Sequence, residues 1–287
     1  MPAPIFIPPK QRSLIFFFNL TVAISWAFWV PAALASQGRI SFPLPSALST
    51  LAGVSGPFVA AVITVTRYEG RLGLKQLFGR LLIWRVGIQW YLFALLWPVV
   101  FSLAKTGIAV WMGGAAPDFS QPPFASLYPL PPELSNVSPF LLLPFVFLQQ
   151  TLIGSSMGEE IGWRGYALPR MQAQEGAFRA SVLLGVIWAV WHLPLWLTKG
   201  HPMQGTFFGW TLLGLMATSV LFTWVYNNTQ GSLLPALLFH SSIAITGLFL
   251  SSTAPPVLVD LALNWAMALL VIVVFGPKRL SRPEGIA

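Results

Sequence analysis

The sequence predicts an all-α fold, a polytopic bundle of about eight transmembrane helices in which residues 1–287 form a single integral membrane domain. Three observations support this prediction: the composition, a series of long apolar segments, and an uneven distribution of basic residues. Hydrophobic residues make up 55% of the chain and charged residues only 8%, whereas a soluble domain has about 25% charged residues. The composition therefore favours a chain that lies largely in lipid.

Eight apolar segments recur along the chain, each close to the ~20 residues that a helix needs to cross a bilayer. They are residues 14–35, 46–66, 89–112, 139–158, 181–197, 207–226, 233–250 and 257–275. The connection 113–138 is rich in Pro and Ser, contains no Lys or Arg, and includes Asp118 and Glu133. We expect it to form an irregular loop on the outer side of the membrane.

The basic residues are sorted between the two sides of the membrane if the N-terminus is placed in the cytoplasm. Three of the 16 Lys and Arg residues then lie outside: Arg39, Lys105 and Lys199. The others lie on the inner side: Lys10, Arg12, Arg67, Arg71, Lys75, Arg80, Arg85, Arg164, Arg170, Arg179, Lys278, Arg279 and Arg282. This excess follows the positive-inside rule, so we predict cytoplasmic N- and C-termini in the plasma membrane, or in the inner membrane of a bacterium. Because the sorting accounts for the net charge of +8, the expected partner is the lipid bilayer and not nucleic acid.

Residues 67–86 combine basic side chains with a helical pattern of apolar ones. The apolar residues, among them Leu74, Leu77 and Leu81, mostly share one helix face, and the basic residues lie largely elsewhere. This pattern is typical of an amphipathic helix that lies at the membrane interface. We predict such an interfacial segment on the inner leaflet.

Two adjacent carboxylates, Glu159 and Glu160, follow directly after a long apolar segment. An ionisable residue at membrane depth indicates a functional site, because burying a charge in lipid is costly. Arg164 follows Glu160 by four residues, the spacing of an ion pair on one helix face, and Glu159 points about 100° away from Glu160 around the helix. We therefore predict that Glu160 is held by Arg164 and that Glu159 acts as a base.

The glycines of the same stretch, Gly158, Gly162 and Gly165, carry no side chain. They would let a neighbouring backbone or a substrate approach closely.

Two of the chain's three histidines lie inside predicted spans. His192 lies in the fifth span and His240 in the seventh, whereas His201 follows Lys199 in a predicted outer loop. Counting 1.5 Å per helical residue from the nearest polar residue on the inner side puts His192 about 20 Å deep, His240 about 18 Å and Glu159 about 16 Å. All three would share one layer of a hydrocarbon core about 30 Å thick. We expect them to converge on a cavity open to the cytoplasm.

Such a cluster could activate a water molecule for hydrolysis. A carboxylate in a poorly solvated cavity accepts a proton more readily than one in water, as a general base requires. Taken singly, the residues have simpler explanations: a solvated helix end with a routine ion pair for the carboxylates, and an interhelical hydrogen bond for each histidine. These explanations would all have to hold at once.

Three motifs follow one another in the chain: Glu159-Glu160-x-x-x-Arg164, Trp188-x-x-x-His192, and His240. Together they resemble the ordered motifs of the CPBP family, which comprises the type II CAAX prenyl endopeptidases and related bacteriocin-processing, Abi-like proteins. The resemblance covers about residues 139–250, which we take as the catalytic core. It implies an eight-helix intramembrane endopeptidase whose site faces the cytoplasm.

The resemblance also implies a role for each motif residue. Glu159 and His192 would activate the attacking water, and Glu160 would pair with Arg164. His240 would hold the substrate carbonyl or the oxyanion that develops from it. The expected partner is then a membrane-embedded or lipidated peptide or protein substrate.

One position departs from the family pattern. The third motif usually carries Asn or Asp four residues after its histidine, and here that residue is Ala244. Loss of one oxyanion donor costs about 100- to 1000-fold in rate. Ser241, Ser242 and Asn264 are candidate substitutes. The departure supports an alternative, a catalytically weakened pseudo-protease that binds membrane proteins.

Zinc is a candidate cofactor. Glu159, His192 and His240 would form a His₂Glu set of the kind that leaves an open position for water, although the sequence contains no H-E-x-x-H motif. We favour a water activated by glutamate without a metal.

Two further alternatives involve other chemistry. Residues 154–158 match G-x-S-x-G, so Ser156 with His192 would form a Ser–His protease site, although that motif belongs to a strand-turn-helix setting. A proton-coupled transporter would also use buried Glu and His residues. Transporters of this kind often contain internal repeats, and we find none in the sequence.

Overall fold

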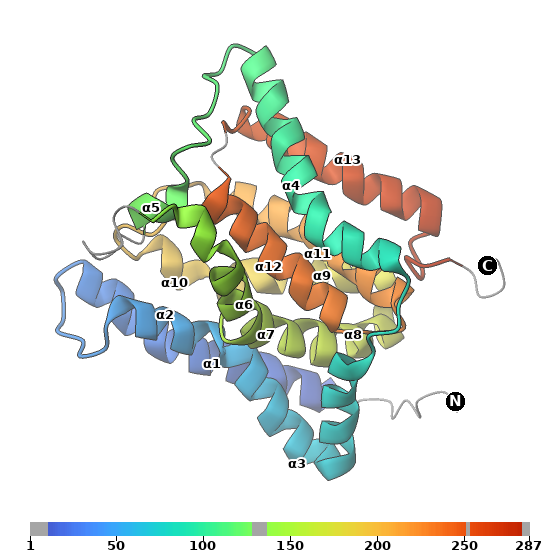
Figure 1. The fold of residues 1–287 in the computed structure, drawn as a ribbon. Helices are drawn as coiled ribbons and strands as arrows, with labels where there is room; N and C mark the ends of the chain where they lie inside the picture. Colours follow the sequence, from blue (N-terminus) through green and yellow to red (C-terminus); the bar gives the residue numbers. More distant parts are fainter. Residues whose placement is uncertain (1–10, 128–136, 251–252, 283–287) are drawn as a thin grey trace.

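The computed structural model describes residues 11–127, 137–250 and 253–282, so Lys10 and Glu133 lie outside the described residues. Every regular element in these ranges is a helix, which confirms the all-α prediction (Figure 1). The elements in chain order are α1 (Gln11–Ser36), α2 (Ser46–Val54), α3 (Gly56–Gly79), η1 (Arg80–Leu82), α4 (Ile88–Trp111), α5 (Pro123–Leu127), η3 (Pro139–Leu142), α6 (Leu143–Leu152), α7 (Ser155–Glu160), η4 (Ile161–Ala167), α8 (Leu168–Glu175), α9 (Ala177–Trp191), α10 (Leu193–Trp196), α11 (Phe208–Asn228), α12 (Leu234–Phe249) and α13 (Val257–Phe275).

Six helical stretches in the described part of the chain are long and apolar enough to cross a membrane. They are Arg12–Ser36, Ser46–Leu82, Ile88–Trp111, Pro139–Glu175, Phe208–Asn228 and Val257–Phe275. The protein is therefore a multi-pass membrane protein, although a count of eight spans is not confirmed. The fifth and seventh predicted spans correspond to α9 and α12, which have only 15 and 16 residues.

The two short helices end or begin at residues that interrupt a helix. Pro194 follows the last residue of α9 by three positions and lies in the first turn of α10, and proline cannot continue a helical hydrogen-bond ladder. Gly231, with φ at 74°, closes the turn before α12, a conformation that favours glycine. His192 therefore caps the C-terminus of α9, and His240 lies near the middle of α12.

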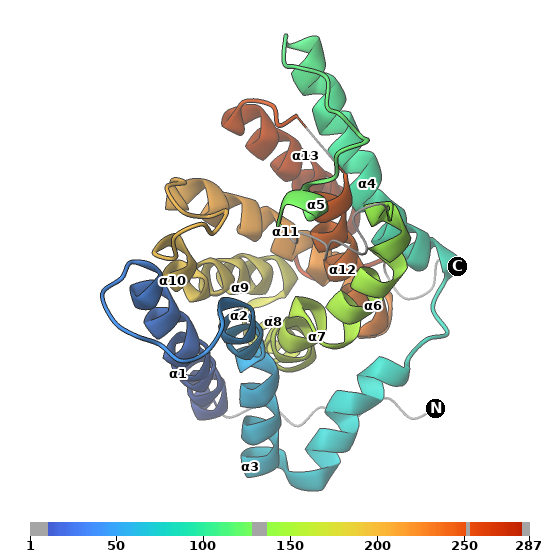
Figure 2. The same cartoon turned by 60° about the vertical axis from the view of Figure 1, so that its left-hand side comes forward.

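The helices that carry the three motifs lie together at the centre of the bundle (Figures 1 and 2). Helix α9 packs along α11, and α12 packs against both α4 and α7. A Cβ atom at Gly158 would lie 2.6 Å from the carbonyl oxygen of Val54, and one at Gly162 would lie 2.5 Å from that of Pro57. The predicted close backbone approach is thus confirmed at these two glycines, which bring α7 and η4 against the junction of α2 and α3.

Helix α7 continues without a break past the two carboxylates. It runs into η4, a π-helix, and then into α8, which extends to Glu175. Single π-helical turns are rare and frequently occur at functional sites. The depth estimate for Glu159 assumed a continuous helix from Glu159 to Arg170. This helix is present.

The depth count for His240 is too large. Residues 229–233 form a turn between α11 and α12, so they do not advance along a helix axis. His240 follows the start of α12 by six residues, which corresponds to about 9 Å rather than about 18 Å.

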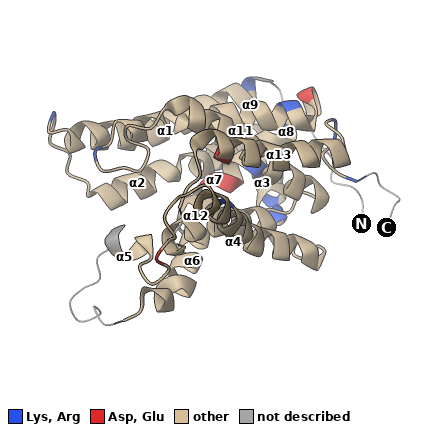
Figure 3. Ribbon diagram, turned by 90° about the horizontal axis from the view of Figure 1, so that it is seen from above, with Lys and Arg blue, Asp and Glu red and all other residues tan. Residues whose placement is uncertain are grey.

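Most of the basic residues lie toward one end of the bundle, and a few lie at the other (Figure 3). Main-chain hydrogen bonds join the segments found there: Ala177 donates to Lys278 and Leu233 donates to Arg80. We call this the basic end. At the opposite end, the Lys199 N–H donates to Ser36 Oγ over 3.0 Å. The residues predicted to lie on the inner side are therefore separated in space from Lys199. That the basic end faces the cytoplasm stays a prediction.

The predicted interfacial segment 67–86 begins inside α3. Gly70 interrupts this helix with φ 65° and ψ −156°, so the chain changes direction there before the second half of α3 and η1. Its position on the membrane surface stays a prediction.

Candidate active site

A buried ion pair occupies the centre of the bundle. Arg164 Nη1 lies 3.1 Å from Glu160 Oε1, and neither side chain is exposed. The guanidinium lies over two aromatic rings, with Cζ 4.7 Å from the ring centre of Trp188 and 4.1 Å from that of Phe222. A desolvated cation–π contact of this kind contributes about 2 kcal/mol, which offsets part of the cost of burying the charge.

His240 connects this ion pair to the second carboxylate. Its Nδ1 lies 2.7 Å from Glu160 Oε1, and because an ionised carboxylate only accepts, Nδ1 donates this bond. The opposite ring nitrogen, Nε2, lies 3.9 Å from Glu159 Oε1 and 3.1 Å from Ser155 Oγ. Glu160 thereby fixes the ring so that Nε2 points toward Glu159.

The two oxygens of Glu159 have different surroundings. Oε2 accepts hydrogen bonds from the indole N–H groups of Trp188, over 2.6 Å, and Trp163, over 3.3 Å. Oε1 makes no hydrogen bond with any described residue, and His240 Nε2 lies beyond hydrogen-bond distance of it. The carboxylate is therefore held through one oxygen, and the other oxygen is left able to accept a proton.

His192 follows Trp188 by four residues, at the end of α9. Its Nδ1 donates to the main-chain carbonyl of Trp188 over 2.8 Å, and its ring contacts those of Trp191 and Trp29 with centroids 4.6 Å and 6.1 Å away. Trp188 thus links Glu159 through its indole and His192 through its carbonyl. No direct hydrogen bond joins Glu159 and His192 in the described structure.

Ser156, the nucleophile of the alternative Ser–His site, forms its hydrogen bond with a serine and not with His192. The hydroxyl of Ser156 is fully buried and shares a hydrogen bond of 2.7 Å with Ser241, which also contacts Thr151 over 2.7 Å. Its neighbour Ser155 is the serine that contacts a histidine, His240. The described residues therefore contain no Ser156–His192 hydrogen bond.

The candidate substitutes for the missing amide are not equally placed. Asn264 Nδ2 donates to the main-chain oxygen and a side-chain oxygen of Asp260, one helical turn earlier, and so belongs to a separate cluster on α13. Ser242 Oγ is buried and has no hydrogen-bond partner among the described residues. An amide does reach the cluster from α6, because Gln150 Nε2 donates to Ser155 Oγ over 2.5 Å.

His201 lies away from the cluster. It follows α10, and its Nδ1 accepts a hydrogen bond from the main-chain N–H of Met203 over 3.2 Å. The structure therefore brings together four of the five predicted site residues by direct side-chain contact or near contact, and it connects the fifth, His192, through Trp188.

Four residues that contact the cluster were not assigned a role from the sequence: Gln150, Ser155, Trp163 and Trp188. Trp163 follows Glu159 by four residues, so helical spacing could have indicated its hydrogen bond. Trp188 belongs to the second motif, but a tryptophan in an apolar segment more often packs than donates. Nothing in the sequence connects Gln150 or Ser155 with His240.

The predicted zinc ligands do not form a complete set as they lie. Among the described residues, no group of three or more His, Cys, Asp or Glu side chains is arranged to hold a metal ion. Both histidines use Nδ1 in other hydrogen bonds, so only their Nε2 atoms would remain to bind zinc. The zinc hypothesis stays a prediction that metal analysis of the purified protein, with activity before and after chelation, would test.

The fold and the site define a class: a multi-pass helical membrane protein with a central, buried cluster of carboxylate, imidazole and guanidinium groups. Within this class, residues 139–246 match the family model described as type II CAAX prenyl endopeptidase Rce1-like. The chain is also 27% identical over 136 residues to "CAAX prenyl protease 2" of Methanococcus maripaludis. That match covers 45% of this chain and 49% of the relative, so the chain matches about half of its relative's length. The resemblance that the motifs indicated is confirmed, and all five predicted site residues lie inside the matched segment.

Proposed function

We propose that this protein is an intramembrane endopeptidase that hydrolyses a peptide bond of a membrane-associated or lipidated substrate. The observation that carries the proposal is the geometry of Glu159. One of its oxygens is fixed by two indole N–H groups. The other makes no hydrogen bond with a described residue and lies 3.9 Å from His240 Nε2. This arrangement suits a general base, which must be held in position while one oxygen stays able to accept a proton.

In the proposed reaction, Glu159 Oε1 takes a proton from a water molecule while the water oxygen attacks the substrate's carbonyl carbon. His192 assists by holding the water through Nε2. When the carbon–nitrogen bond breaks, the proton returns from Glu159 to the leaving nitrogen. One water is consumed, and one carboxyl and one amino terminus are released.

His240 would hold the substrate carbonyl and the oxyanion that forms from it. Its ring is oriented by Glu160, which is itself held by Arg164. Ser155 and Gln150 extend this chain of hydrogen bonds from the other side. We propose that the Gln150 amide, acting through Ser155, partly compensates for Ala244.

The first substrate to test is a peptide with a prenylated C-terminal cysteine motif, because the Methanococcus relative is named a CAAX prenyl protease. We further propose that the site faces the cytoplasm across a plasma membrane or bacterial inner membrane. The gathering of basic residues at one end of the bundle supports this orientation.

The test is cleavage by the full-length protein reconstituted in liposomes, with prenylated and unprenylated forms of one peptide. Glu159→Gln and His192→Ala should each abolish cleavage, because both remove a group that activates water. Glu175→Gln provides a matched control, since it makes the same chemical change at an exposed residue near the end of α8. Cleavage that survives both active-site substitutions would overturn the glutamate mechanism, and a wild-type protein that cleaves neither peptide would count against the proposed activity.

A further inference from the structure

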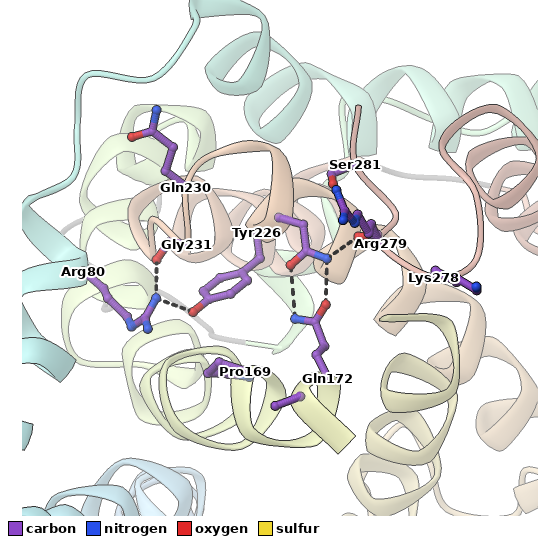
Figure 4. A pocket seen from close by; sticks show the side chains of 11 residues that line it. Arg80, Pro169, Gln172, Tyr226, Gln230, Gly231, Lys278, Arg279 and Ser281 are labelled. Atoms are coloured by element: carbon purple, nitrogen blue, oxygen red, sulfur yellow. Dashed lines mark hydrogen bonds between the residues drawn. The ribbon is translucent and has the colours of Figure 1, made fainter. Parts of the chain in front are cut away.

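The basic end contains a pocket that the proposed reaction does not use. It has a volume of about 490 Å³ and lies among η1, α8, the end of α11 and the segment after α13 (Figure 4). Three basic residues line it, Arg80, Lys278 and Arg279, and no acidic residue among those that the structure describes does so. From this pocket we infer a binding site for a phosphate ester anion, and its position points to the headgroup of an anionic phospholipid.

The charges of the pocket are not balanced by an acidic side chain in the described part of the chain. None of its three basic residues forms an ion pair with a described residue, in contrast to Arg170 nearby, which pairs with Glu69. Arg80 uses one nitrogen to bind neutral partners: Nη1 donates to Tyr226 Oη over 2.6 Å and to the Gly231 carbonyl at 3.5 Å. A guanidinium held in this way keeps further N–H donors for a phosphate, which it can bind through two parallel hydrogen bonds.

The main chain of the segment after α13 is held in place beside the pocket. Asn227 Nδ2 donates to the Arg279 carbonyl over 2.6 Å, and Asn228 Nδ2 donates to the Leu280 carbonyl over 2.9 Å. Leu280 is fully buried and adopts a φ of 47°, which is unusual for a residue with a side chain. Burial and two amide hydrogen bonds therefore keep a strained turn that presents Lys278 and Arg279.

The wall between the basic groups is polar. Gln172 and Asn227 exchange two hydrogen bonds, of 3.1 Å and 2.7 Å. In Figure 4, Tyr226 and Gln172 lie between Arg80 on one side and Lys278 and Arg279 on the other. Amide and hydroxyl groups at this position suit the hydroxyls or ester oxygens of a group attached to the phosphate. The volume is in the range of small-molecule pockets and so admits more than an isolated phosphate ion.

The location favours a lipid as the source of the phosphate. Three candidate spans end at the pocket, because Arg80 lies near the end of Ser46–Leu82, Tyr226 near the end of Phe208–Asn228, and Lys278 just after Val257–Phe275. Trp84 and Trp224 lie close in the chain to Arg80 and Tyr226. The rings of Trp90 and Trp224 are 4.8 Å apart, and Trp84 is 60% exposed. Tryptophan is enriched at the membrane–water interface, where basic pockets between helices bind anionic headgroups.

The test is ligand binding by the full-length protein in neutral detergent, measured by native mass spectrometry and by the shift in unfolding temperature. The probes are short-chain phosphatidylglycerol, short-chain phosphatidylcholine and inorganic phosphate. The wild-type protein should bind phosphatidylglycerol at least tenfold more tightly than phosphatidylcholine. Removal of each basic residue should weaken phosphatidylglycerol binding about fivefold.

Two double variants are compared with the wild type. One combines Arg80→Gln with Arg279→Gln. The other combines Lys278→Gln with Arg279→Gln and leaves the Arg80–Tyr226 hydrogen bond intact. The matched control is Arg39→Gln with Lys199→Gln, which removes the same charge from a pocket at the opposite end. The control should bind as the wild type does. Displacement of phosphatidylglycerol by millimolar phosphate would support the phosphate site and assign it to a soluble ligand.

Equal binding of phosphatidylglycerol and phosphatidylcholine would overturn the inference. Unchanged phosphatidylglycerol binding in the variant with Lys278→Gln and Arg279→Gln would do the same. Neither result bears on the proposed protease activity, because the pocket shares no residue with the candidate active site.

Discussion

Two ion pairs in this protein differ in burial and, we infer, in purpose. Glu160 and Arg164 are 0% exposed, whereas the side chains of Lys105 and Asp260, 2.8 Å apart, keep 25% and 34% of their exposure. A buried pair has a desolvation cost that can exceed its attraction, whereas a partly exposed pair forms with little cost and little gain. The comparison suggests that the buried pair is present for the site that it orients, and the exposed pair for local packing between α4 and α13.

The largest expected effect on stability comes from breaking the buried pair. Arg164→Met should destabilise the protein by about 3–5 kcal/mol, because the buried charge of Glu160 loses its cationic partner and keeps only its hydrogen bond with His240. Reversible unfolding in mixed detergent micelles measures this difference. The double variant with Glu160→Gln should cost less than the sum of the single variants. Strict additivity would contradict the interpretation of a coupled pair.

Trp188→Phe should reduce cleavage about 10- to 100-fold. The substitution keeps an aromatic ring but removes the N–H that holds Glu159 Oε2 over 2.6 Å, and a hydrogen bond to a charged group is worth about 1.5–3 kcal/mol. Single-turnover rates in liposomes measure the effect. Trp90→Phe serves as the control, because its ring packs on Trp224 away from the cluster; an equal loss there would argue against a specific role for the Trp188 indole.

Ser155→Ala should lower the cleavage rate about three- to tenfold. It removes a neutral hydrogen bond to His240 Nε2, worth about 1 kcal/mol, and disconnects Gln150 from the site. Gln150→Leu should lower the rate by a similar factor, and combining the two should add little. An effect of the double variant equal to the product of the two would show that Gln150 does not act through Ser155.

Lys105→Met should have the smallest effect, a change of about 0–1 kcal/mol in the free energy of unfolding. Cleavage should be unchanged, since Lys105 pairs with Asp260 and not with the central cluster. The same unfolding assay used for Arg164→Met gives a direct comparison. A cost as large as that of the buried pair would remove the distinction between the two ion pairs.

The sequence could predict what depends on local spacing. Glu160 and Arg164 contact each other because they are four residues apart on a helix, and the glycines of the motif meet a neighbouring backbone because they lack side chains. The contact between Glu160 and His240 joins residues 80 positions apart, so spacing alone could not predict it. The order of the family motifs indicated that these residues belong together, but their catalytic roles stay predictions.

Other features depended on packing that a single sequence does not reveal. Counting apolar residues predicted eight spans, but it could not find where Pro194 ends α9 or how a turn shortens the approach to His240. Helical spacing could have indicated that Trp163 contacts Glu159, but in a chain with 13 tryptophans nothing distinguishes Trp188 from those that only fill space. The pocket at the basic end combines residues from four elements, and its basic residues had been interpreted only as a topology signal.

The central claim is that Glu159, and not a serine, drives hydrolysis. The most direct measurement compares cleavage of one lipidated peptide in liposomes by the wild type, Glu159→Gln and Ser156→Ala. The account predicts loss of cleavage in Glu159→Gln, by about 100- to 10,000-fold for removal of a general base, and cleavage near the wild-type rate in Ser156→Ala. Loss of cleavage in Ser156→Ala together with an active Glu159→Gln protein would contradict it.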